Sequence, residues 1–153
     1  MAERIYLVIM DETEESRLAL RFASRRAART GGMVHIVALV PKQDFVAFGG
    51  VQATIEAEAR SRAEALVTSA AGSLVSEGGR TPVVAVKEGE AVKVVRDCLG
   101  EHPEVSALVL GAAADGNPGP LVSHFAVAHP GQLPCPLMIV PGSISEETID
   151  RLS

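Results

Sequence analysis

Two segments of the sequence carry residue types that can bind a small ligand. Asp11 directly follows an apolar run, and its carboxylate can accept hydrogen bonds from the amine or hydroxyl groups of a ligand. It can equally cap the helix that the following residues predict. Segment 111–123 is rich in glycine and other small residues, which let backbone amides approach an anion at the start of a helix. An ordinary turn of glycine and proline is the alternative, and the sequence leaves both questions open.

Catalytic motifs are incomplete or absent. Gly111 and Gly116 have the GxxxxG spacing of a phosphate-binding P-loop, but Asn117 and Pro118 replace the Lys and the Ser or Thr that should follow. The sequence contains no GxGxxG dinucleotide fingerprint and no GxSxG nucleophile elbow. Its four histidines lack the HxH or HxxxH spacing that would predict a metal site. We therefore assign no catalytic residue and no metal ligand.

The composition excludes several classes of partner. The 153 residues carry 14 basic and 19 acidic side chains, and the formal net charge of −5 disfavours nucleic-acid binding, which needs a basic face. The longest apolar run, at 5–10, is far shorter than the roughly 20 residues of a membrane span. No export signal is recognised, and Cys98 and Cys135 fit no disulfide framework. We therefore expect a cytoplasmic protein that contacts neither nucleic acid nor membrane.

Five short apolar runs must position these residues. The runs, at 5–10, 34–40, 82–86, 107–110 and 137–140, are nearly continuous, which is typical of strands buried on both faces of a parallel sheet. The segments between them predict helices at 13–30, 52–77 and 90–99 and a shorter helix from about 120 to 129. This alternation predicts one doubly wound domain over residues 1–153, an α/β/α sandwich of three layers. Residues 143–153 form a polar tail that can end in a short helix.

A row of arginines marks the first predicted helix. Arg17, Arg21, Arg25 and Arg29 recur every four residues and therefore share one helix face. Such a row is typical of a solvent-exposed face, which is the interpretation we favour. Contact with an acidic partner is the alternative.

Segments in order along the chain resemble the universal stress protein family. They are LVIMD at 7–11 with EES at 14–16 and ALRFA at 19–23, VHIVALV at 34–40, EGEA at 88–91, LVLG at 108–111, and LPCPLMIVP at 133–141. The resemblance covers nearly the whole chain. It implies a Rossmann-like sheet of five parallel strands in the order 3-2-1-4-5, a cytoplasmic homodimer and a role in stress resistance.

The resemblance also implies a nucleotide motif, which this sequence matches only in part. Many members of the family bind ATP through G-x-x-G, nine further residues, and G-[S/T]. Gly111 matches the first glycine, but Ala114 stands at the second, and the pair after nine residues is His124-Phe125. We therefore expect ATP to bind weakly or not at all.

Six residues make up the ligand site that the resemblance implies. Asp11 would face the adenine, and the backbone of Leu39 would lie beside it. A rearranged loop would place the remaining residues around a phosphate: Gly111, Gly116, Gly119 and Ser123. ATP or another adenine nucleotide is the candidate ligand of this site.

The implied strand order makes the fifth strand an edge of the sheet. Its residues are apolar and lack the lysine that commonly blunts an exposed edge. They are Pro136, Leu137, Met138, Ile139 and Val140. We expect two copies to pair antiparallel through this strand as a homodimer. The alternative is a monomer in which the polar tail folds back over the edge.

Two classes of function follow from the sequence. The favoured one is a protein of the stress response that acts by binding a ligand or partner, with an adenine nucleotide as the candidate ligand. The alternative is a dimeric interaction module whose pocket is empty or holds another small ligand. A nucleotide hydrolase would have only Asp11 and Asp115 as acid–base groups, so catalysis is not expected.

Overall fold

The chain folds around one parallel sheet of five strands. A computed structural model describes residues 3–41 and 49–153. The sheet has the order β3-β2-β1-β4-β5, which confirms the order expected from the family resemblance. The strands are β1 Ile5–Met10, β2 Met33–Pro41, β3 Val83–Gly89, β4 Ala107–Ala112 and β5 Leu137–Pro141.

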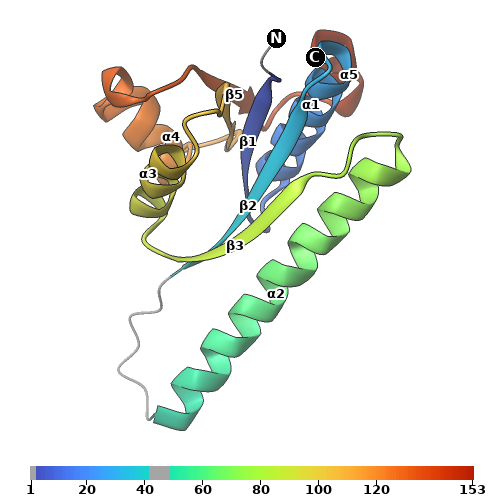
Figure 1. The fold of residues 1–153 in the computed structure, drawn as a ribbon. Coiled ribbons are helices and arrows are strands. Elements are labelled where there is room, and N and C mark those ends of the chain that lie inside the picture. The colour runs from blue at the N-terminus through green and yellow to red at the C-terminus, as the bar shows by residue number, and fades with distance from the viewer. Residues whose placement is uncertain (1–2, 42–48) are drawn as a thin grey trace.

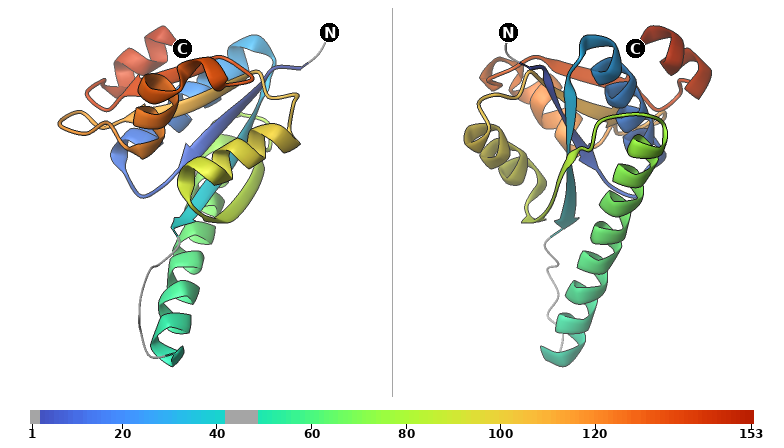
Figure 2. Two further views of the ribbon diagram at one scale, coloured as in Figure 1. Left: turned by 90° about the vertical axis from the view of Figure 1, so that its left-hand side faces the viewer. Right: turned by 45° about the vertical axis from the view of Figure 1, so that its right-hand side comes forward.

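Helices cover both faces of this sheet and complete the predicted three layers (Figure 1). One face carries α1 (Glu14–Thr30), α2 (Gly49–Ser76) and α5 (Glu146–Leu152), and the other carries α3 (Ala91–Glu101) and α4 (Pro120–Val122). The fourth predicted helix is regular only over its first turn. It continues as a π-helical turn, η1 (Ser123–Ala128), and a 3₁₀ turn, η2 (Pro130–Gln132). The N-terminal end of α2 projects beyond the sheet (Figure 2).

The central strand explains why an apolar run without alternation predicts burial on both faces. All six residues of β1 are buried. Tyr6, Val8 and Met10 pack toward α1 and α2, whereas the alternate residues of the strand pack toward α3 and α4. A strand with a helical layer on each side needs apolar side chains at every position.

The same prediction is wrong for β3, which forms one edge of the sheet. Val83 and Val84 are 48% and 44% exposed. At the opposite edge, Ile139 of β5 is 42% exposed. Edge strands lie at the margin of the helical layers, so an apolar run there does not imply burial of both faces.

The first helix has a side-chain cap at its start and a glycine at its end. Thr13 is the N-cap, and its hydroxyl oxygen accepts a hydrogen bond from the backbone N–H of Ser16 at 3.3 Å. At the other end, Gly31 adopts a φ of +68°, the left-handed conformation that glycine tolerates best. The N-cap is therefore Thr13 and not Asp11, for which capping was the alternative to ligand binding.

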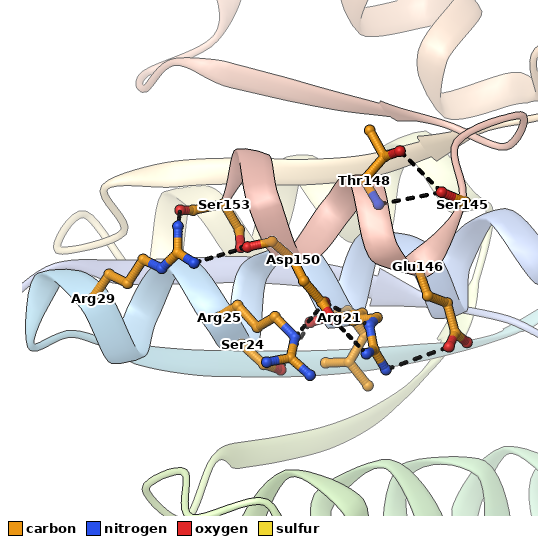
Figure 3. A network of polar contacts seen from close by, with 10 residues as sticks. Arg21, Ser24, Arg25, Arg29, Ser145, Glu146, Thr148, Asp150 and Ser153 are labelled. Carbon is orange, nitrogen blue, oxygen red and sulfur yellow. Dashed lines mark hydrogen bonds and ion pairs between the residues drawn. The ribbon is translucent and has the colours of Figure 1, made fainter.

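The arginine row is solvent-exposed only in part, which corrects the favoured interpretation: Arg17 is 62% exposed, whereas the next three arginines contact the C-terminal tail. Figure 3 shows that Arg21, Arg25 and Arg29 reach the C-terminal helix α5, which packs against α1. Arg21 Nε and Nη2 each donate to a carboxylate oxygen of Asp150 at 2.8 Å, and Arg25 Nε lies 2.5 Å from the same carboxylate. Arg29 donates to the backbone oxygens of Asp150 and Ser153 at 2.8 and 2.5 Å. The acidic partner of the row belongs to the chain's own tail.

The polar tail forms the short helix that the sequence allows. Ser145 caps α5 by accepting a hydrogen bond from Thr148 N at 3.2 Å, and Ile149 is 1% exposed. The helix docks on α1. The alternative to a dimer had the tail fold back over the β5 edge instead. Within the described part of the chain, no helix has both the length and the apolar character needed to cross a membrane.

Candidate functional site

A small cavity lies at the carboxyl ends of β1 and β2. Its volume is about 180 Å³, and it brings together Asp11, which follows β1 directly, and Leu39 near the end of β2. The remaining lining residues are Glu12, Ala59, Arg62, Ala63 and Leu66. Open α/β sheets bind ligands outside the carboxyl ends of their strands, so this cavity stands where the fold favours a ligand.

Asp11 serves the local turn and keeps one oxygen available. Its Oδ1 accepts hydrogen bonds from the backbone N–H of Thr13 at 2.8 Å and from the Thr13 hydroxyl. The backbone oxygen of Asp11 accepts a further bond from Ser16 Oγ at 2.9 Å. In the described part of the chain, Oδ2 receives no hydrogen bond, and the side chain is exposed. Holding the turn before α1 and binding a ligand are therefore compatible roles for Asp11, because each uses a different oxygen.

The second wall of the cavity comes from α2, which the sequence did not assign to the site. Ala59 and Ala63 are buried one helical turn apart, and their small side chains leave space above the strand ends. Arg62 extends across the opening, with its Nε 3.4 Å from Glu12 Oε1. Both side chains of this pair are more than half exposed, and such pairs contribute little to stability. The pair can therefore separate when a ligand enters.

Gly111 is needed for packing, whatever else it does. A Cβ at this position would lie much closer to the backbone oxygen of Glu15 than a van der Waals contact allows, because the first turn of α1 crosses β4 there. Close approach of two backbones is one of the conditions that only glycine satisfies. Packing of β4 against α1 is thus enough to explain the glycine at position 111, without a role in ligand binding.

Several polar groups of the loop after β4 are paired within the loop. Asn117 Oδ1 accepts hydrogen bonds from Gly119 N at 2.9 Å and from Ser123 Oγ at 3.4 Å, and Ala113 N donates to Pro118 O at 3.2 Å. Gly119 and Ser123 are thus gathered around an amide side chain of the loop. Asn117 was not among the predicted site residues. Its Oδ1 accepts the hydrogen bonds that Gly119 N and Ser123 Oγ would otherwise donate to an anion.

The loop also sets the register of the incomplete nucleotide motif. Because α4 begins at Pro120, the pair Gly119-Pro120 stands at the start of this helix, and His124-Phe125 lies one turn later, in η1. Gly116 and Gly119 adopt φ angles of +70° and +114°. None of Gly111, Gly116, Gly119 and Ser123 lines the cavity of Asp11 and Leu39. Two of the six predicted residues therefore line one cavity, whereas the other four lie at the end of β4 and in the segment that follows it.

Thiol and metal chemistry have no arranged site in the described residues. Cys98 is buried and Cys135 is half-buried, and burial raises the pKa of both thiols, which makes them poor nucleophiles at neutral pH. Among residues 3–41 and 49–153, no group of histidine, cysteine or acidic side chains is placed to hold a metal ion.

The sheet order and the helices on both of its faces define an α/β protein of the Rossmann-like class. The family model for the universal stress protein family matches residues 1–141. The chain belongs to this family. Helix α5, which begins at Glu146, lies beyond the matched residues.

Solved structures of the family share this fold at low sequence identity. Universal stress protein UspA from Lactobacillus plantarum is 18% identical with a TM-score of 0.76, and the match covers 92% of this chain and 99% of that one. A universal stress protein from Archaeoglobus fulgidus is 19% identical with a TM-score of 0.62, covering 91% and 94%. A universal stress protein in complex with cAMP is 16% identical with a TM-score of 0.57, covering 94% and 100%. No curated protein matches the chain.

Proposed function

We propose that the chain acts in the stress response as a binding protein, and that the cavity of Asp11 and Leu39 takes the base of an adenine nucleotide. The observation that carries this proposal is the convergence of these two residues on one cavity, with Asp11 Oδ2 free to accept a hydrogen bond. Adenine presents an amino group that donates to such an oxygen and a flat apolar surface suited to Leu39 and the alanines of α2. The cAMP complex of a family member supports adenine as the ligand class.

The size of the cavity limits how much of a nucleotide it can hold. At about 180 Å³ it is smaller than the roughly 300–1,000 Å³ of sites that enclose whole small molecules. The base would be enclosed, and the sugar and phosphates would extend outside. Asn117 already holds Gly119 N and Ser123 Oγ, and Pro120 has no N–H to offer. Phosphates would therefore add little affinity, and ATP would bind weakly.

Calorimetric titration with adenosine, AMP, cAMP and ATP tests this proposal. Asp11→Asn keeps an oxygen for Thr13 but replaces the free carboxylate oxygen with an NH₂ group, which cannot accept a bond from the adenine amine. A hydrogen bond to a charged group contributes about 1.5–3 kcal/mol, so affinity for all four ligands should fall roughly tenfold to a hundredfold. Asp97→Asn is the matched control, because Asp97 lies on α3 and pairs with Lys93.

Two results would contradict the proposal. Unchanged affinities in Asp11→Asn would remove this carboxylate from the site. Sub-micromolar binding of ATP together with negligible binding of adenosine would show that the phosphates, and not the base, supply the affinity.

The second candidate function, a dimeric interaction module, rests on the β5 edge. Ile139 exposes 42% of its surface there, and α5 docks elsewhere. Light scattering should report a dimer that Ile139→Lys dissociates, since a charge at the centre of a paired edge opposes association. Val75→Lys is the control, because Val75 is similarly exposed, at 46%, on α2. A monomeric parent chain, or equal effects of the two variants, would argue against the module.

A further inference from the structure

A second cavity lies on the other face of the sheet, away from Asp11. It has a volume of about 310 Å³ and is bounded by α3, η1, η2 and the segment that leads to β5. Leu99, Phe125 and Leu133 supply apolar lining, while Arg96, His124 and His129 supply polar groups. The combination of an apolar body with a few convergent polar groups is typical of small-molecule sites.

Arg96, His124 and His129 each carry a nitrogen that can donate a hydrogen bond, and Gln132 adds an amide group. Arg96 Nη2 lies 3.1 Å from His124 Nε2. Because a guanidinium can only donate, Nε2 accepts, and the proton of His124 sits on Nδ1. The His129 ring packs 4.8 Å from the His124 ring between centroids. Two imidazoles and a guanidinium thus stand together at one rim.

Acidic side chains do not neutralise this rim. The lining includes no Asp or Glu, and Arg96 makes no ion pair within the described part of the chain. Glu90, at the start of α3, uses both carboxylate oxygens to accept bonds from Val92 N and Lys93 N, at 3.0 and 2.9 Å. Its pKa is lowered chiefly by these two bonds, with a smaller effect of the charge on Arg96. The guanidinium of Arg96 therefore remains available to an external anion.

The π-helical turn is what brings the two histidines together. In an α-helix, residues five apart point about 140° away from each other. In η1, His129 N donates to His124 O at 2.9 Å, the five-residue bond that defines a π turn, and the two rings come within 4.8 Å of each other at a tilt of 50°. Such turns are rare and occur frequently at functional sites. This irregular turn lies directly beside the cavity.

We propose that this cavity binds a small organic carboxylate with an apolar body. The carboxylate would be held by Arg96, whose planar fork matches two carboxylate oxygens, with imidazole N–H groups of His124 and His129 as further donors. The apolar body would pack on Leu99, Phe125 and Leu133. The site is independent of the proposed adenine cavity, because α3 and η1 cover the opposite face of the sheet.

The probes of choice are benzoate, benzamide and inorganic phosphate, titrated into the ¹⁵N-labelled chain and followed by NMR. Benzoate should shift the amide signals of Gly100, His129 and Gln132, which border the cavity. Benzamide has the same shape without the charge, and phosphate has charge without the apolar body. Each should bind at least about tenfold more weakly than benzoate, because each lacks one half of the interaction.

Two variants tie the binding to the rim. Arg96→Gln should weaken benzoate at least about tenfold, as expected for the loss of a charged hydrogen-bond pair. His129→Gln, at an exposed position, should weaken it a few-fold and serves as a second variant if the first does not fold. Arg60→Gln, an exposed arginine of α2 paired with Glu64, is the control.

The proposal fails on any of three results. Equal binding of benzamide would leave an uncharged apolar cleft, and equal binding of phosphate would leave a bare anion site. If Arg96→Gln and Arg60→Gln weakened benzoate binding equally, the cause would be the change in net charge and not the loss of a contact at the rim. Adenosine binding at Asp11 should not change in Arg96→Gln or His129→Gln, so the two proposals are tested separately.

Discussion

The docking of α5 on α1 should depend on Ile149, the residue of α5 that is buried almost completely, at 1% exposure. A helix of seven residues does not persist alone in water, so α5 exists only while it is docked. Ile149→Ala removes three carbon atoms, worth roughly 2.4 kcal/mol at about 0.8 kcal/mol per buried methylene. The cavity left by the missing atoms adds to this cost, so the free energy of docking α5 should fall by about 3 kcal/mol in total.

Hydrogen exchange measures this loss where it arises. A docking free energy reduced by about 3 kcal/mol should accelerate exchange of the α5 amides roughly a hundredfold. The amides of Ile149 and Ser153, which donate to Ser145 O at 3.0 Å and to Ile149 O at 2.9 Å, are the ones to follow. Leu152→Ala, on the same helix but 57% exposed, should change exchange very little. Unchanged protection of α5 in Ile149→Ala, or equal effects of both variants, would refute the reasoning.

Three further predictions follow from individual residues. Gly111→Ala should destabilise the chain in urea denaturation by about 1–3 kcal/mol because its Cβ overlaps the α1 backbone, whereas Gly100→Ala, with open space around it in α3, should stabilise it by up to about 1 kcal/mol. Burial lowers the pKa of His35 from 6.5, so stability should decline as pH falls below 6.5, and His35→Gln should remove this part of the decline. The hydrogen bond from Arg21 lowers the pKa of Asp150 from 3.8, so its contribution should persist above pH 3.8 and disappear on further acidification, and Asp150→Asn should lack that step.

The sequence predicts the strands well because burial in a parallel sheet leaves a direct signature in residue type. The prediction of burial fails for residues at the edges of the sheet. Val83 and Val84 are as apolar as the residues of β1, yet they stand at an edge, and only the strand order distinguishes the two cases. That order came from the family resemblance, since hydrophobic pattern alone does not encode which strands are neighbours.

The contact between the arginine row and the tail illustrates a second limit. Arg21 and Asp150 are both visible in the sequence, but they are 129 positions apart. The spacing of the arginines predicts a shared helix face without indicating what covers it. Only the path of the chain after β5 brings the acidic helix to that face.

The candidate site was predicted in part for an analogous reason. Asp11 and Leu39 meet because both stand at the carboxyl ends of neighbouring parallel strands, which the sequence allows one to infer. Arg62 and the alanines of α2 come from the middle of a long helix, where no motif marks them. The motif spacing counted from Gly111 overruns the helix start, because Pro120 begins α4 earlier than that spacing requires.

The central position of β1 has a consequence for synthesis on the ribosome. β1 pairs with β2 over six residues but needs β4, which begins at Ala107, to cover its other edge. Once β3 has ended at Gly89, about twenty further residues must be added, which takes roughly one to four seconds at 5–20 residues per second. During this interval the nascent chain can form a three-stranded unit whose apolar first strand is still open to pairing. A chaperone that shields this edge would act in that interval.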